Sequence, residues 1–271
     1  MDIIPIFTSD FSDPLLIENL KKYANWNFQS AIFLIKNTPI DNAEHLFLEY
    51  SAFLGCPYEE KNEAKEIIQS ITPNKKEAYE QTSNSSLIEL ELHIENIWTT
   101  SVPDWVWLMC VHNDERADTL IFYPQECIEE LKAKHMSIYK YLTEPAYYFL
   151  EPESFRKKLW HNSRQKTSLK LYPVLYVNEN GTLDINCDFD AIMSDSPEHI
   201  HAVKYFYSFI YPKYVRKICL ENWDIVFIRN TSWSWRYTSC MHGRSKFEPN
   251  AQNPRLLKRI FIAHHTSSHN L

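Results

Sequence analysis

Three glutamates and one histidine alternate with apolar residues in the segment SLIELELHIENIW at 86–98. Alternation with a period of two is typical of a β-strand, because successive side chains point to opposite faces. Glu89, Glu91, His93 and Glu95 would share one face, with His93 and Glu95 close enough together to hold one metal ion. A solvent-facing edge strand would show the same alternation, so this segment alone does not decide between the two interpretations.

A second histidine and two arginines late in the sequence favour the metal site. His-x-Glu with one distant histidine is the ligand set of the 2-His-1-carboxylate iron oxygenases. His242 supplies the distant histidine, Arg255 lies 13 positions after it (255 − 242), and Arg259 lies four positions further. A loop between antiparallel strands can return these guanidinium groups to the metal, where they would bind a carboxylate. A zinc hydrolase could use the same three ligands, but it would leave the two arginines without a role.

The elements that must position these residues change character along the chain. Helical spacing of apolar residues at 13–26, 41–55 and 58–71 is followed by a polar loop at 72–86. Strands are predicted from residue 87 and at 104–112, 119–123, 224–230 and 256–264, with a hairpin at 168–186 and helices at 124–142 and 196–210. We predict a single α+β domain over 1–271, with a helical part at about 1–72 and a double-stranded β-helix (jelly roll) core at about 85–265 with flanking helices.

Composition narrows the class of protein. The 271 residues are 44% hydrophobic and 14% aromatic, which suits a packed globular chain, and the three glycines lie too far apart for a phosphate-binding loop. A net charge of −7 without a basic stripe argues against nucleic-acid binding. There is no apolar run long enough to cross a membrane, no leader-like start, and no C-x-x-C among the six cysteines. We therefore expect a cytoplasmic protein with reduced thiols that binds neither membranes nor nucleic acid.

Four short motifs point to a known family. They are LELHIE (90–95), PDWVWLMC (103–110), HGRSKFEP (242–249) and RLLKR (255–259). Together they resemble the clavaminate synthase-like branch of the TauD-like iron(II)/2-oxoglutarate-dependent oxygenases, which includes hydroxylases of arginine and asparagine. The stretch NDERADTLIF (113–122) resembles the family's turn before a threonine that helps to bind 2-oxoglutarate, and the whole match spans about two thirds of the chain.

The resemblance implies the roles of the residues around the metal. His93, Glu95 and His242 would be the catalytic iron(II) ligands. Arg255 would pair with the distal carboxylate of 2-oxoglutarate, assisted by Thr119.

The resemblance also implies substrate-binding residues. Arg259 would hold the α-carboxylate of an amino-acid substrate, with Ser83 or Ser85 as a polar contact to the same group. The acidic segment at 184–199 resembles a lid in which Asp188 or Asp190 contacts the substrate side chain, although either aspartate could instead cap a turn.

The sequence does not decide the roles of the other two glutamates of the segment at 86–98. Glu91 or Glu89 would reach the substrate's amino group or a neighbour of the metal ligands, and a surface charge is an equal alternative.

By this resemblance, the chain would use iron(II), 2-oxoglutarate and O2 to hydroxylate an unactivated carbon of a free L-amino acid or a derivative, with succinate and CO2 as coproducts. The acidic candidates favour an arginine-like substrate through charge complementarity. Glu95 favours hydroxylation over halogenation, since halogenases of the superfamily lack this carboxylate. The alternatives are a desaturase or cyclase of the same family in a natural-product pathway, and a non-catalytic ligand-binding jelly roll.

The chain departs from the family pattern before its second histidine. Asn222-Trp223-Asp224 stands where the family usually has Gly-Asp, and the link that follows is longer and rich in tryptophan. Trp233 and Trp235 would be either ordinary packing residues or a reshaped wall of the substrate pocket.

Overall fold

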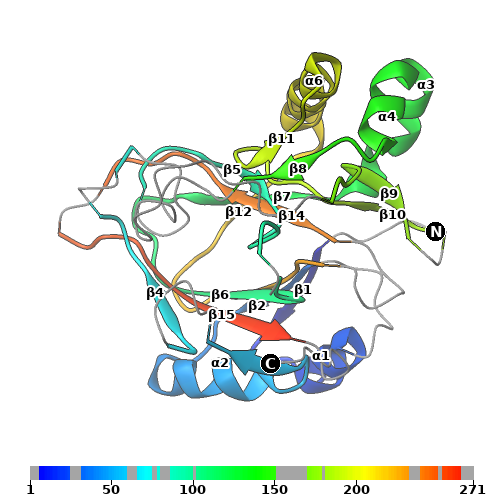
Figure 1. Cartoon of the computed structure of the whole chain (residues 1–271). Helices are drawn as coiled ribbons and strands as arrows, with labels where there is room; N and C mark the ends of the chain where they lie inside the picture. Colours follow the sequence, from blue (N-terminus) through cyan, green and yellow to red (C-terminus); the bar gives the residue numbers. More distant parts are fainter. Residues whose placement is uncertain are drawn as a thin grey trace.

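Two facing β-sheets with helices on their outer sides make up the protein in the computed structural model (Figure 1). The structure describes residues 6–24, 32–59, 66–74, 78–79, 86–99, 102–150, 170–178, 181–231, 239–249 and 252–263. The mixed arrangement of helices and several sheets confirms the predicted α+β class.

The larger sheet has seven strands, and the latest strand of the described chain, β15, lies beside its edge strands. Its order is β1-β2-β13-β6-β15-β3, and β4 also pairs with β15. Strands β13 and β15 flank β6 in antiparallel register. The strands are β1 (Ile6–Asp10), β2 (Ile32–Lys36), β3 (Cys56–Tyr58), β4 (Gln69–Ile71), β6 (Trp105–His112), β13 (Ile225–Arg229) and β15 (Leu256–Ala263).

The smaller sheet has four antiparallel strands in the order β12-β7-β14-β5. Two further two-stranded pairs, β8 with β11 and β9 with β10, lie beside it (Figure 1). The strands are β5 (Leu90–His93), β7 (Asp118–Phe122), β12 (Arg216–Cys219), β14 (Met241–Arg244), β8 (Tyr148–Phe149), β11 (Ile192–Met193), β9 (Leu175–Val177) and β10 (Leu183–Ile185).

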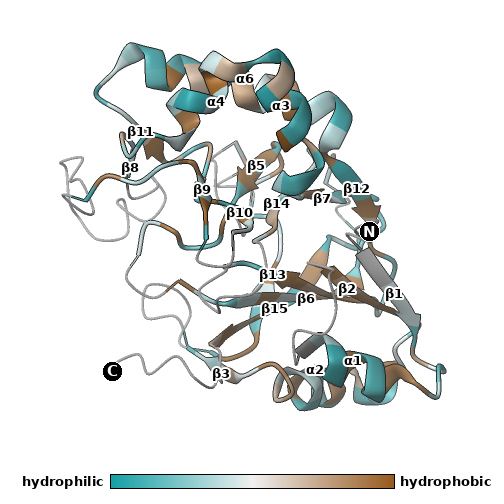
Figure 2. Ribbon diagram, turned by 90° about the vertical axis from the view of Figure 1, so that its right-hand side faces the viewer, coloured by the Kyte–Doolittle hydropathy of each residue, from teal (hydrophilic) through white to brown (hydrophobic). Residues whose placement is uncertain are grey.

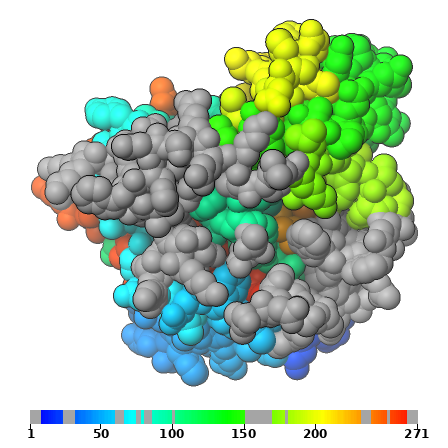
Figure 3. All heavy atoms as spheres, in the orientation of Figure 1, coloured from blue at the N-terminus to red at the C-terminus, as the bar shows by residue number. Residues whose placement is uncertain are grey.

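Helices gather at the two opposite ends of the molecule (Figures 1 and 3). Helices α1 (Leu16–Ala24) and α2 (Ala43–Ser51) lie outside the larger sheet. Helices α3 (Ile128–Lys134), α4 (Met136–Thr143) and α6 (Pro197–Tyr214) lie outside the smaller sheet, and short 3-10 turns occur at Ile40–Asn42 and Pro124–Glu126. In the part of the chain that the structure describes, no helix is long and apolar enough to cross a membrane.

The alternation of side chains along β6 shows how the layers are built. Trp105 and Trp107 pack with α1 and α2 in one apolar cluster, whereas Val106 and Leu108 belong to a second cluster that reaches β7 of the other sheet. The central strands are accordingly brown in the hydropathy view, while the helices carry teal residues on their outer sides (Figure 2). An apolar interior between the sheets therefore surrounds any site built there.

The predicted third helix at 58–71 is wrong in its described part. Strand β3 ends at Tyr58, and Gln69 to Ile71 form β4, which pairs with β15. The helical spacing of local residues is overridden because the edges of the larger sheet offer these segments backbone hydrogen bonds and burial. Strands β1 and β2 were also not predicted. β2 is a short apolar segment with four buried residues in succession, so its side chains do not alternate between apolar and polar as a half-buried strand's do.

The later elements follow the prediction more closely. Ser196 caps α6 by accepting a hydrogen bond from the His199 backbone, and the helix continues to Tyr214, beyond the predicted end at 210. The predicted helix at 124–142 is divided, since His135 leaves the helical conformation between α3 and α4. The hairpin forms between β9 and β10, with Gly181 at a φ of 76° in its turn.

Candidate functional site

Strands from opposite halves of the sequence bring two predicted metal ligands together. β14 pairs with β5, and the register puts His242 directly opposite His93. The centroids of the two imidazole rings are 4.4 Å apart. Gly243 permits this pairing, because a Cβ atom there would lie 2.6 Å from the Leu90 carbonyl oxygen. The motif therefore needs glycine for close backbone approach rather than for an unusual backbone angle.

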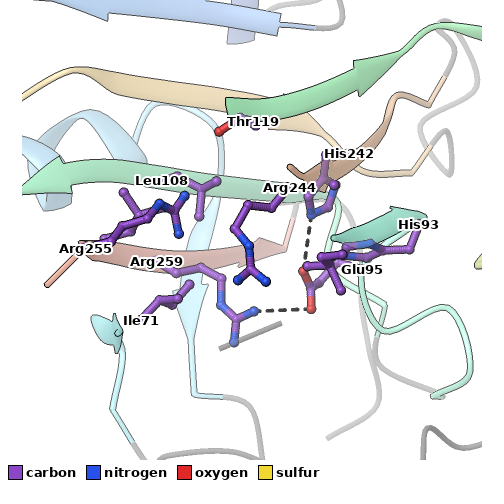
Figure 4. Close-up of a pocket in the computed structure, with 12 residues that line it drawn as sticks. Ile71, His93, Glu95, Leu108, Thr119, His242, Arg244, Arg255 and Arg259 are labelled. Atoms are coloured by element: carbon purple, nitrogen blue, oxygen red, sulfur yellow. Dashed lines mark hydrogen bonds and ion pairs between the residues drawn. The ribbon is translucent and has the colours of Figure 1, made fainter. Parts of the chain in front are cut away.

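Glu95 follows β5, and its carboxylate faces both rings. Its Oε2 lies 3.6 Å from Nε2 of His93 and 3.3 Å from Nε2 of His242. One donor atom from each of the three residues lies within 4.8 Å of the others, and all three side chains are buried (Figure 4). Two imidazole nitrogens and one carboxylate oxygen form the ligand set of non-haem iron(II) sites.

The backbone fixes the ring of His93 in the form that a metal ligand needs. Its Nδ1–H donates to the Glu91 carbonyl oxygen over 2.8 Å, so Nε2 is the nitrogen that faces Glu95. Nδ1 of His242 is buried and has no hydrogen-bond partner among the described residues. The ring of His242 is instead oriented by its place in β14.

The electrostatics of the three residues favour a bound cation. Burial alone would raise the pKa of Glu95, but the Arg259 guanidinium and the two histidines outweigh it and hold the pKa well below its ordinary value. Burial and the neighbouring His93 lower the pKa of His242 to about 4. Burial would likewise lower the pKa of His93, but Glu95 raises it above its ordinary value. At neutral pH Glu95 is therefore ionised and His242 is neutral, as metal ligation requires.

Two buried amides that we did not predict hold the metal ligands in place. Asn230, directly after β13, accepts from the Glu95 backbone N–H over 2.7 Å and donates to the Glu95 carbonyl oxygen over 3.1 Å. Gln69 of β4 accepts from Nε and Nη2 of Arg259 over 3.1 and 2.6 Å, and Nη1 of Arg259 lies 3.3 Å from Oε1 of Glu95. The sequence did not single out Gln69, because its segment was predicted to be helical. Asn230 could have been singled out, since it is a polar residue at the end of a predicted buried strand.

A cavity joins the three metal ligands to a group of cationic and polar side chains (Figure 4). We call His93, Glu95 and His242 the metal end of this cavity, and Thr119, Arg244 and Arg255 its anion end. The cavity also includes Arg259, so every predicted metal and 2-oxoglutarate residue lines it, together with the predicted substrate arginine.

The anion end contains two buried guanidinium groups. Arg255 is 4% exposed and Arg244 is 5% exposed. Burial lowers the pKa of Arg255 to about 10, and burial together with Arg255 lowers the pKa of Arg244 to about 9. We did not predict a role for Arg244, although strand alternation puts it on the same face as His242 and could have revealed it.

Three predicted acidic residues lie beside the metal end and do not line the cavity. Asp188 forms a backbone bridge with His93, and its Oδ1 accepts from the backbone N–H groups of Asp190 and Ala191 over 3.0 and 3.2 Å. It is therefore a turn-capping aspartate in this structure. Asp190 is exposed, and Glu91 is half-buried with a pKa raised by burial and by the nearby Asp190 and Asp188.

Glu89 has a defined contact that separates it from Glu91. The hydroxyl of Tyr207 donates to Oε1 of Glu89 over 3.0 Å, and the hydroxyl of Tyr211 donates to Oε2. Both tyrosines belong to α6, so Glu89 ties this helix to the start of β5. Ser83, Ser85, Trp233 and Trp235, which the sequence also singled out, lie outside the described residues.

The departure from the family pattern at Trp223 has a structural counterpart. Trp223 adopts a φ of 72°, in the left-handed region that favours glycine. Its backbone N–H donates to the Cys110 carbonyl oxygen over 2.6 Å, which holds the turn before β13. The chain therefore places a bulky residue in a backbone conformation that glycine adopts more easily.

Comparison with known proteins agrees with this geometry. A family model described as taurine catabolism dioxygenase TauD, TfdA family, matches residues 7–261. The chain belongs to the TauD/TfdA family. This assignment confirms the predicted class of enzyme, the iron(II)- and 2-oxoglutarate-dependent oxygenases, and the three ligands of the metal end are present in it.

Solved structures share the TauD-like fold. Asparagine oxygenase, in a complex with Fe(II), 2S,3S-3-hydroxyasparagine and succinate, has a TM-score of 0.77 and 19% identity, covering 92% of this chain and 79% of that one. The non-heme iron oxygenase OrfP, in a complex with Fe and alpha-ketoglutaric acid, has a TM-score of 0.69 and 18% identity, covering 92% of this chain and 80% of that one.

One curated relative is similar over a limited stretch. L-lysine 3-hydroxylase of Catenulispora acidiphila is 34% identical over 87 residues, which are 32% of this chain. The match spans 24% of that relative's length. This TauD/TfdA protein is thus similar in sequence to a hydroxylase named for lysine, and in fold to oxygenases crystallised with hydroxylated asparagine and arginine.

Proposed function

We propose that this protein is an iron(II)- and 2-oxoglutarate-dependent dioxygenase that hydroxylates an unactivated carbon of a free L-amino acid or an amino-acid derivative. The observation that carries the proposal is one cavity with a buried His-Glu-His cluster at one end and two buried arginines at the other. A metal site alone would suit several reactions. A metal site with a carboxylate-binding site beside it in the same cavity suits a cosubstrate that is a keto acid with a second, distal carboxylate. Succinate and CO2 would be the coproducts.

The chain's own residues would divide the binding work. His93, Glu95 and His242 would hold iron(II), which when bound supplies oxygen activation coupled to oxidative decarboxylation of 2-oxoglutarate. Arg255 and Thr119 would fix the distal carboxylate of 2-oxoglutarate and so orient its keto-acid end toward the metal end. The apolar residues Leu108 and Leu257, which line the same cavity, would limit the access of water.

The α-carboxylate of the substrate would bind at Arg259, with Ser83 or Ser85 beside it. In the present structure, Arg259 contacts Gln69 through Nε and Nη2 and Glu95 through Nη1. A carboxylate that approaches Arg259 would therefore also lie next to the metal end, which would place the carbons next to the carboxylate near the reacting centre.

The side chain of the substrate is best matched by a cationic group. Burial raises the pKa of Glu91, and the negative charges of Asp190 and Asp188 raise it further, so acidic groups repel one another beside the metal end. An arginine-like or lysine-like side chain would relieve this repulsion. The names of the lysine 3-hydroxylase and of the OrfP complexes with hydroxylated arginine support the same choice.

We further propose that the two facing sheets are the halves of a double-stranded β-helix, and that residues 1–271 form one domain around it. The support is the position of the cavity, whose lining comes from β4, β5, β6, β7, β14 and β15 of both sheets. Such a site needs both sheets to remain fixed relative to each other.

The experiment starts with the full chain, iron(II) and 2-oxoglutarate without oxygen. A visible charge-transfer band is expected, because the keto acid binds the metal through two atoms. Oxygen is then added with a panel of L-amino acids, and succinate and hydroxylated product are measured. Succinate formation stimulated by one cationic amino acid supports the proposal, whereas neither band nor succinate with any member of the panel rejects it. Protein loaded with zinc(II) is the matched control.

A further inference from the structure

Arg244 stands at the junction between the two ends of the cavity. It lies two residues after His242 on β14, and in the register between β14 and β7 it is opposite Thr119. Its side chain extends from the strand into the pocket, alongside the Arg255 and Arg259 side chains (Figure 4).

One nitrogen of the Arg244 guanidinium is hydrogen-bonded to the protein. Nη2 donates to Oγ of Ser86 and to the Ile88 carbonyl oxygen, both over 2.8 Å. These contacts fix the side chain in one orientation, so its position does not depend on a ligand. Arg244 is thus pre-organised toward the cavity by the chain that leads into β5.

A second nitrogen of the Arg244 guanidinium has no partner. Nε of Arg244 is buried without a hydrogen-bond partner among the described residues, and so is Nε of Arg255. No aspartate or glutamate of the described chain forms an ion pair with either arginine, and the Phe247 ring lies 5.1 Å and 5.9 Å from the two guanidinium carbons. The charge of Glu115 acts on Arg255, and Oε1 of Glu115 accepts from the Arg255 backbone N–H over 2.9 Å, but this carboxylate forms no ion pair with the guanidinium. An anion that binds between the two buried guanidinium groups would therefore stabilise them.

We propose that Arg244 is a second guanidinium of the 2-oxoglutarate site, which binds the distal carboxylate together with Arg255 and Thr119. The inference rests on the proposed function, since it takes 2-oxoglutarate as the cosubstrate. A carboxylate has enough lone pairs to accept from two guanidinium groups and a hydroxyl at once. The site would therefore select strongly for 2-oxo acids with a second carboxylate.

The test compares two acids that differ only in that carboxylate. 2-Oxoglutarate and 2-oxopentanoate are titrated calorimetrically into manganese(II)-loaded protein without oxygen, for the wild type and for Arg244→Gln. The variant is expected to bind 2-oxoglutarate about 10- to 100-fold more weakly, the loss of one charge-assisted hydrogen bond, and 2-oxopentanoate as well as the wild type does. A structural role alone would not produce this difference between the acids.

Two matched variants distinguish direct binding of the carboxylate by Arg244 from indirect effects of nearby residues. Ser86→Ala removes one anchor of Arg244 but keeps its charge, and Lys246→Gln removes an exposed positive charge two residues further along. Lys246→Gln should leave the preference for 2-oxoglutarate intact, and Ser86→Ala should reduce it less than Arg244→Gln does. If Arg244→Gln does not fold, Arg244→Lys decides, because it keeps the charge but cannot reach the carboxylate while donating to Ser86 and Ile88.

Equal weakening of both acids by the Arg244 variant, or no weakening of either, would overturn the inference. Wild-type protein that binds the two acids equally well would also overturn it. None of these results depends on oxygen or turnover, so they are distinguishable from failure of the proposed function, which the succinate measurement decides.

Discussion

The metal end and the anion end of the cavity differ in how their polar groups are satisfied. At the metal end, Glu95 contacts both histidines and Arg259, and backbone and amide groups orient the ligands. Among the described residues, Nδ1 of His242 at the metal end and the Nε atoms of Arg244 and Arg255 at the anion end are buried without hydrogen-bond partners. The charged groups of the metal end nevertheless pair with one another, whereas the two guanidinium groups of the anion end form no ion pair with a described residue and are left for a ligand to satisfy. This difference predicts that the two ends can be disabled separately.

The largest effect is expected from removing the carboxylate at the metal end. Glu95→Ala deletes one of three ligands and leaves Arg259 without its ion-pair partner, so iron(II) affinity should fall and turnover should drop by about 1000-fold or more. Iron titration and succinate formation measure the two effects. Glu49→Ala, on the exposed side of α2, is the control. Turnover above a tenth of the wild-type rate would contradict the role of Glu95.

Arg255→Gln should disable only the anion end. Loss of a buried charge-assisted pair weakens binding of 2-oxoglutarate by about 2–4 kcal/mol, while binding of iron(II) in the absence of 2-oxoglutarate should be unchanged. The two affinities are measured separately without oxygen. A matching loss of iron affinity would show that the two ends are not independent.

Gly243→Ala tests the packing that brings the two histidines together. The added methyl group would lie 2.6 Å from the Leu90 carbonyl oxygen, so β5 and β14 must separate. The cost is about 1–3 kcal/mol in the free energy of unfolding, with weaker iron binding as a second consequence. Thermal unfolding and iron titration are the measurements.

Gly181→Ala is the matched control for that prediction. Its Cβ would meet nothing within 4 Å, and its only penalty is the φ of 76°. It should lower the thermal midpoint slightly and leave iron affinity unchanged. If both variants weakened iron binding equally, the close approach at Gly243 would not be the cause.

The smallest effect on activity is expected from Asp184, which does not line the cavity and whose protonation changes the stability of the fold with pH. Asp184 is fully buried, and its Oδ1 accepts from the Ser239 backbone N–H over 2.9 Å. Burial raises its pKa from 3.8 to about 6, so the folded protein binds this proton more tightly than the unfolded chain. The contribution to stability is fully present below pH 3.8 and is lost as pH rises through about 6, a change of roughly 3 kcal/mol.

Asp184→Asn removes this titration with little change of shape. Between pH 4 and 7, the stability of the variant relative to the wild type should increase, as measured by urea unfolding at each pH. A constant difference between the two proteins over this range would show that Asp184 does not titrate there.

That the metal-end residues and the two arginines lie together in one cavity was predictable, because local motifs mark them. His-x-Glu on an alternating strand, a distant His-Gly-Arg and two arginines four positions apart identify the cavity without any tertiary information. The structure adds the pairing of His93 with His242 and the contact of Arg259 with Glu95.

The parts that were missed depend on contacts between distant segments. Gln69 lies in a segment with helical spacing, and only its pairing with β15 makes it a strand residue beside Arg259. Strand β2 is buried on both faces, so its sequence has no alternation. Strand alternation could have put Arg244 on the face of His242, but the lack of an ion-pair partner for it among the described residues is visible only in the structure.

The pairing of β5 with β14 has a consequence for the order of events during synthesis. Glu95 and His242 are 147 positions apart, so the ribosome completes the ligand set only after the helices and every described strand except β15 have been made. Iron(II) therefore cannot act as a template for early folding, as structural zinc does in small domains. The nascent chain must reach a nearly native arrangement first, and acquisition of the metal becomes a late step that reports on correct assembly.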